Sequence, residues 1–183
     1  LPDLNSVAAA ERIMRMAETE ITPDDLVFWL LSGGGSALLV APAPGVTWED
    51  KLVCTRLLLN CGATIRETNA IRKHLSSLKG GGLARLLASV PVISLILSDV
   101  VGDELDSIAS GPLVPDTTTF RECDEILHKL QIENLVPPTV RKRLEAGTSG
   151  RIPENPKPGD PIFRKKVNLI VGSNAQACSA AAH

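Results

Sequence analysis

Three short segments of the sequence carry residues that could bind a negatively charged ligand. The first segment is a run of three glycines between two serines: Ser32, Gly33, Gly34, Gly35 and Ser36. Glycine lets the backbone turn tightly, so that consecutive N–H groups can point at one anion. A helix that begins near Ser36 would add the positive end of its dipole. The run is interpreted as a phosphate or carboxylate site, or alternatively as a tight strand-to-helix turn.

This glycine run does not match the named glycine-rich motifs. It lacks the pattern G-x-x-x-x-G-K-[ST], so it is not a P-loop. Leu38 stands where G-x-G-x-x-G requires its last glycine. The pattern G-x-S-x-G is also missing, which excludes the nucleophile elbow of the α/β-hydrolases.

Basic side chains gather in the second segment, residues 71–79. On a helix, Arg72, Ser76 and Lys79 would form one polar stripe at positions i, i+4 and i+7. A forked arginine and a lysine point charge suit phosphate oxygens, although a solvated charged face has the same pattern. The glycine run at residues 80–82 follows directly and favours a ligand-binding role.

The third segment contains two aspartates, Asp99 and Asp103, behind an apolar run. A carboxylate at a strand end can hold Mg²⁺ or accept a proton from a substrate hydroxyl. Aspartate is also a common turn residue, which is the alternative interpretation. Four further candidates for ligand binding are Ser110, Gly111, Ser173 and Asn174.

The elements that must position these residues can be read from the hydrophobic pattern. Continuous apolar runs at residues 26–31, 92–97 and 167–171 are typical of strands buried on both faces of a parallel sheet. Expected helices cover residues 7–16, 47–61, 68–79, 83–87, 119–130 and 137–146, and a proline-rich surface linker covers residues 148–161.

This alternation predicts an α/β fold with three layers: a mostly parallel, Rossmann-like sheet with helices on both faces. Ligands of such sheets bind outside the carboxyl ends of the strands. We therefore expect residues 32–36, 98–111 and 172–174 to meet at one edge.

The composition argues against several partners. The formal net charge is −2 and aromatic residues make up only 3%, so neither a basic surface nor a stacking platform for nucleic acid is expected. No apolar run approaches the ~20 residues that a membrane-spanning helix needs. The four cysteines show no C-x-x-C spacing and are interpreted as reduced thiols, which favours a cytoplasmic or mitochondrial location.

Seven segments resemble, in order, the class II glycerate kinase family. They are residues 31–38, 62–69, 71–76, 79–84, 97–103, 108–112 and 171–174. The resemblance implies that the γ-phosphate of ATP is transferred to a hydroxyl of D-glycerate with Mg²⁺. It also implies a Rossmann-like N-terminal domain, a smaller MOFRL-type C-terminal domain and an active site between them. Residues 1–183 would be part of the N-terminal domain, without an upstream Gly-Phe-Gly-Lys segment, and are expected to be inactive alone.

On this resemblance, residues 33–36 would hold glycerate or phosphate. Arg72, Lys73 and Lys79 would neutralise phosphate charge, and Lys73 is assigned a catalytic role. Asp99 would act as base or metal ligand, with Asp103 as a second metal ligand. A non-catalytic relative and an NAD-dependent oxidoreductase are the alternatives, the phosphorylated hydroxyl stays open, and a homo-oligomer is compatible with the sequence.

Overall fold

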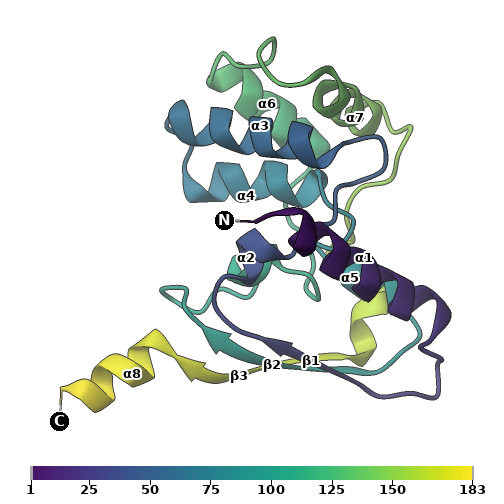
Figure 1. The fold of residues 1–183 in the computed structure, drawn as a ribbon, viewed down its shortest axis with the longest axis vertical. Helices are drawn as coiled ribbons and strands as arrows, with labels where there is room; N and C mark the ends of the chain where they lie inside the picture. Colours follow the sequence, from purple (N-terminus) through teal and green to yellow (C-terminus); the bar gives the residue numbers. More distant parts are fainter. Residues whose placement is uncertain (1, 183) are drawn as a thin grey trace.

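The structure is a computed structural model that describes residues 2–182. Three parallel strands form one sheet in the order β1-β2-β3: β1 (Val27–Leu31), β2 (Val92–Ser98) and β3 (Lys166–Ser173). Each apolar run expected to be a strand is one, to within two residues. The predicted α/β fold with a parallel sheet is confirmed (Figure 1).

Two helices pack on one face of this sheet. They are α1 (Leu4–Thr19), whose first turn is capped by the side chain of Asp3, and α5 (Gly82–Leu86). Their apolar side chains join those of β1 and β2 in a buried cluster that includes Ala10, Leu83, Leu87, Val92 and Leu113. Burial of this cluster holds the helices against the sheet.

The second face of the sheet is exposed over the described residues. Large apolar side chains from all three strands lie on the surface: Phe28, Leu30, Leu97, Val167, Leu169 and Val171. We expected helices on both faces, and residues 2–182 place them on one. In Figure 1, α1 and α5 lie above the sheet.

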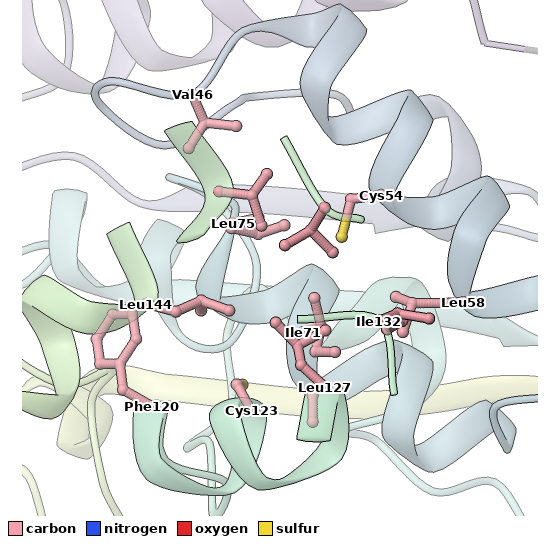
Figure 2. Packing of buried hydrophobic residues seen from close by; sticks show 13 residues of the cluster. Val46, Cys54, Leu58, Ile71, Leu75, Phe120, Cys123, Leu127, Ile132 and Leu144 are labelled. Atoms are coloured by element: carbon pink, nitrogen blue, oxygen red, sulfur yellow. The ribbon is translucent and has the colours of Figure 1, made fainter. Parts of the chain in front are cut away.

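Four helices of 10 to 13 residues form a second layer of packing above the first. They are α3 (Trp48–Asn60), α4 (Ile65–His74), α6 (Phe120–Lys129) and α7 (Pro138–Thr148). Their shared core contains Val46, Cys54, Leu58, Ile71, Leu75, Phe120, Cys123, Leu127, Ile132 and Leu144 (Figure 2). This helical core is separate from the cluster on the sheet, so the chain has two hydrophobic centres.

Helix α4 differs from its predicted range of 68–79. It begins earlier because Thr64 and Glu67 form a reciprocal capping box. It ends at His74 because the chain then turns to bond with another segment: the N–H of Ser77 donates to the carbonyl of Ala41. Lys79 therefore lies beyond the helix and does not share a helical stripe with Arg72.

The remaining elements are short or terminal. They are α2 (Gly35–Leu38), η1 (Ile108–Ser110), η2 (Pro161–Lys165) and α8 (Asn174–Ala181), which extends from the end of β3 (Figure 1). Residues 148–161, expected to be a surface linker, fold back onto the domain. Asn155 is buried and donates to Asp116, and the carbonyl of Glu154 accepts from Arg85.

The contact between α7 and Phe120 generates a stability prediction. A β-carbon at Gly147 would lie 2.1 Å from Cγ of Phe120. In an open helix, replacing glycine by alanine stabilises by about 0.5–1 kcal/mol. Here we expect Gly147→Ala to lower the free energy of unfolding by about 1–3 kcal/mol, because the core is overpacked. Urea denaturation measures the sign, and a gain in stability would contradict this packing.

Candidate functional site

The carboxyl ends of the three strands meet at one edge of the sheet. Leu31 pairs with Ile96, and Ser98 pairs with Ser173. The loops that follow β1, β2 and β3 therefore start side by side, as we expected from the sequence. The candidate site is built on these loops and on the helices that contact them.

The glycine loop after β1 presents unused backbone donors. Gly34 has φ +84°, a conformation that favours glycine. The N–H groups of Gly34, Gly35 and Ser36 donate to no backbone carbonyl within residues 2–182. Helix α2, which begins beside Ser36, is a single turn of four residues. The free N–H groups themselves are thus what this loop offers to an anion.

The carboxylate of Asp99 lies against the glycine loop. A β-carbon at Gly33 would come within 2.8 Å of Oδ2 of Asp99, so a larger residue at position 33 would displace this carboxylate. Asp99 is exposed, and its side chain is in no ion pair within the described residues. Asp103 follows in a left-handed conformation with φ +55°. Within residues 2–182 no three or more histidine, cysteine, aspartate or glutamate side chains are grouped so that they could hold a metal ion.

A strained turn faces the glycine loop from the other side. Ala109, Ser110 and Gly111 are consecutive left-handed residues, with φ of 50°, 60° and 63°. Hydrogen bonds from the N–H groups of Gly80 and Gly81, 2.9 and 2.8 Å long, fix the carbonyls of Ser110 and Gly111. The left-handed conformation costs of order 1–3 kcal/mol at each of the two non-glycine residues, Ala109 and Ser110, and persists where the surroundings hold it. The second glycine run therefore secures a turn.

The hydroxyl of Ser110 connects this turn to the glycine loop. It is fully buried and lies 2.8 Å from the hydroxyl of Ser36. On its other side it lies 3.5 Å from Oδ1 of Asn69 in α4. The structure thus brings together Ser36 and Ser110, two candidate residues from different predicted loops.

Arg72 and Lys79 converge on the same point from the helical side. Nη2 of Arg72 donates to the carbonyl oxygen of Ser36 at 2.5 Å, and Nζ of Lys79 donates to the same oxygen at 2.8 Å. Lys79 is 1% exposed. Burial, together with the charges of Lys51 and Arg72, holds the pKa of Lys79 well below its ordinary value. Two of the three basic residues predicted to neutralise phosphate charge, Arg72 and Lys79, thus lie beside the glycine loop.

Lys73 lies on another side of α4 and has anionic partners. Its Nζ lies 3.2 Å from Oδ2 of Asp106 and 3.5 Å from Oδ1 of Asp116. Burial works to raise the pKa of Asp116, but the hydrogen bond from Asn155 and the charge of Lys73 outweigh it and hold the pKa below its ordinary value. The charge of Lys73 is thus neutralised within the chain.

Ser173 and Asn174 occupy the end of β3. The hydroxyl of Ser173 accepts from the N–H of Gln176, and the N–H of Ser173 donates to the Gln176 side chain, which makes a capping box for α8. Asn174 is the exposed first residue of that helix. Both residues lie at the predicted edge, where Ser173 stabilises the start of α8.

Sequence reasoning missed a lysine and a buried aspartate that the structure places at the site. Lys51 in α3 shares a buried stripe with Cys54 and Leu58, at i, i+3 and i+7. A lysine in such an apolar stripe was the signal that could have revealed it. Asp116 carries no comparable signal, because it lies in an irregular segment between Val114 and Thr118.

The fold is a parallel α/β domain, and its strand ends carry a glycine loop with two basic side chains beside it. The chain belongs to the family described as "Domain of unknown function (DUF4147)", which matches residues 1–145. No helix within residues 2–182 is both long and apolar enough to cross a membrane.

Two of the similar proteins described here are named glycerate kinases, in agreement with the resemblance seen in the sequence, and a third has a different name. A rat glycerate kinase is 46% identical over 181 residues, which are 99% of this chain and 33% of the rat protein. A protein of Agrobacterium vitis named putative hydroxypyruvate reductase is 47% identical over 147 residues, 80% of this chain and 37% of its own length. A solved glycerate kinase from Thermotoga maritima has a TM-score of 0.85 and 35% identity, over 99% of this chain and 40% of that structure.

The resemblance to glycerate kinases is therefore confirmed over the length of this chain. The chain spans about a third of the rat protein and two fifths of the Thermotoga structure. The family assignment thus concerns this part of the relatives.

The two acidic partners of Lys73 allow a matched test of its environment. Asp116 is fully buried, whereas Asp106 is 46% exposed. We expect Asp116→Asn to lower the free energy of unfolding by about 3–5 kcal/mol, because it leaves a buried ammonium short of its partner. Asp106→Asn should cost less than about 1 kcal/mol. Urea denaturation of both variants checks this difference, and equal effects would show that Asp116 does not compensate Lys73.

Proposed function

We propose that the protein is a glycerate kinase that uses ATP and Mg²⁺ to phosphorylate a hydroxyl of D-glycerate. The observation that carries this proposal is the unpaired carboxylate of Asp99, packed against Gly33 beside free N–H groups. Phosphoryl transfer needs a positioned hydroxyl and neutralised phosphate charge more than covalent catalysis. The names of the rat and Thermotoga relatives support the same activity.

The residues divide into three roles in this proposal. The N–H groups of Gly34, Gly35 and Ser36 donate to an oxyanion of substrate or nucleotide. Arg72 and Lys79 supply positive charge behind Ser36, where they strengthen electrostatic stabilisation of the transferred group. Asp99 accepts the proton of the attacking hydroxyl or serves as a metal ligand. Lys73, paired with Asp106 and Asp116, holds α4 to the strained turn, and its assigned catalytic role would require the release of these partners.

The donor set around Asp99 fits magnesium. Mg²⁺ prefers oxygen ligands and is commonly held by one or two carboxylates plus phosphate oxygens and waters. Asp99, exposed and without an ion pair among the described residues, and Asp103 in the same loop supply such carboxylates. When bound, the ion would neutralise phosphate charge; the orientation of the substrate falls to the glycine loop and Asp99.

The active unit in this proposal is longer than residues 1–183. The chain spans a third to two fifths of the relatives. In this proposal, the C-terminal domain that the resemblance implies would complete the site, and residues 1–183 alone would not turn over. We place the protein in the cytoplasm or mitochondria, with a small hydroxy acid as its partner and neither nucleic acid nor membrane. The four cysteines, which are free thiols in the structure, agree with a reducing compartment.

A second candidate is an oxidoreductase, which the name of the Agrobacterium relative favours. The glycine run argues against it, because it lacks the G-x-G-x-x-G spacing of dinucleotide-binding loops. Hydroxypyruvate-dependent oxidation of NADH by the full-length protein would establish the reductase instead.

The direct test is ADP release by the full-length protein with Mg-ATP, with and without D-glycerate. We expect release to depend on glycerate, and NMR of the product identifies the phosphorylated hydroxyl. Asp99→Asn should lower kcat by about 100-fold or more, since it removes a proton acceptor or metal ligand. Asp24→Asn, at an exposed position before β1, is the control and should leave kcat unchanged. Normal turnover by Asp99→Asn would exclude Asp99 as the proton acceptor and as a metal ligand.

A further inference from the structure

Lys51 is a buried cation without a partner. It lies on the inward stripe of α3, is 6% exposed, and its Nζ makes no hydrogen bond within the described residues. A buried ammonium group without a hydrogen-bond acceptor is rare, because its desolvation is not compensated. Neither the family description nor the sequence motifs assign this lysine a role. Its environment therefore requires an explanation.

The space beside Lys51 is a cavity of about 300 Å³ at the junction of α2, α3 and α4. Four cationic side chains line it: Lys51, Arg56, Arg72 and Lys79. No aspartate or glutamate is among its lining residues within the described part of the chain. The rest of the wall is largely apolar and includes Trp48 and Leu52. The cavity thus combines positive charge with a low-dielectric wall.

The hydrogen-bond partners of Arg72 and Lys79 within the described residues do not neutralise the positive charge of these side chains. Arg72 and Lys79 donate to the neutral carbonyl oxygen of Ser36, at 2.5 and 2.8 Å. A carbonyl satisfies a hydrogen bond without neutralising the ion, so the positive charge of the cavity stays uncompensated. This differs from Lys73 on the other side of α4, which faces two carboxylates. This contrast indicates that the counter-ion for the positive charge around Lys51 comes from outside the chain.

We propose that this cavity is an oxyanion subsite in which Lys51 binds a carboxylate or phosphate group of a small ligand. The ligand chemistry is a compact group of two or three negatively charged oxygens that replaces the missing acidic partner. Ser36 forms part of the wall, so the subsite lies directly behind the free N–H groups of the glycine loop. The inference rests on the proposed kinase function only for the identity of the ligand: the carboxylate of glycerate or a phosphate of the nucleotide.

The protonation of Lys51 supports a site completed by an anion. Burial, with smaller contributions from the charges of Arg72 and Arg143, lowers the pKa of Lys51 to about 7, and Cys54 opposes this only weakly. Arg56 and Lys79 are other basic groups on the cavity wall, and burial, with the charges of Lys51 and Arg72, also holds the pKa of Lys79 well below its ordinary value. An anion beside the ammonium would raise the pKa again, so binding should take up a proton and weaken as the pH rises above 7.

The first experiment compares Lys51→Met with the wild type in the full-length kinase. We expect an increase of about 10- to 100-fold in KM, because a charge-assisted hydrogen bond is lost. An increase for D-glycerate identifies the carboxylate as the ligand group, and an increase for Mg-ATP identifies a phosphate. Lys142→Met, an exposed lysine in α7, is the matched control and should change neither constant. Unchanged constants in Lys51→Met would overturn the subsite.

The second experiment does not depend on kinase activity. Inorganic phosphate and D-glycerate, added at constant ionic strength, should raise the Tm of the wild type and of Lys142→Met but not that of Lys51→Met. Without ligand, Lys51→Met should be as stable as the wild type or more stable, because it removes an uncompensated buried charge. A large loss of stability in Lys51→Met would instead assign Lys51 a structural role and overturn the proposal.

Calorimetry on the wild type keeps the proposal testable if Lys51→Met does not fold. Titration with phosphate or glycerate at about pH 8, in two buffers of different ionisation enthalpy, should show uptake of up to about one proton. Binding without proton uptake, or no binding of either anion, would contradict the subsite. Anion binding without glycerate-dependent ADP release would refute the kinase function and leave the subsite standing.

Discussion

The carbonyl oxygen of Ser36 is one of the points at which the sheet and the helical core are joined. It accepts hydrogen bonds from Arg72, at the end of α4, and from Lys79, in the turn that leads to α5. Ser36 itself belongs to the loop after β1, so these two bonds connect the sheet to the helical core. They also place two buried cations beside free backbone donors. The geometry of the candidate site depends on this junction more than on any single helix.

The junction concentrates positive charge that the chain does not neutralise. Buried ions without counter-charges oppose folding, and here the two hydrophobic cores on either side offset that cost. The strained turn at Ala109–Gly111, which is held by the glycine run at residues 80–82, adds to this cost of folding. Sites that carry strain and uncompensated charge are commonly those that bind ligands, because binding relieves what the free protein must tolerate. The same reasoning separates Lys51 from Lys73, whose carboxylate partners are internal.

The sequence predicted the sheet and the edge of the site because both depend on local patterns. Continuous apolar runs defined β1, β2 and β3, and the rule that ligands bind at strand ends placed the glycine loop and Asp99 together. The predicted end of α4 was wrong because the helix is ended by a long-range contact, the hydrogen bond between Ser77 and Ala41, which the local sequence does not reveal. The pairing of Lys73 with Asp116 could not be predicted for the same reason. Lys51 could have been found, since a lysine within an apolar helical stripe is a local signal.

The central claim is that the positive charge at the Ser36 junction is completed by an anionic ligand. A crystal structure of the full-length protein with D-glycerate and a non-hydrolysable ATP analogue tests it most directly. We predict an oxyanion of one of these ligands within about 3 Å of Nζ of Lys51, with another at the N–H groups of the glycine loop. Both ligands bound with Lys51 still unpartnered, or with an acidic side chain from outside residues 1–183 paired with Lys51, would contradict this prediction.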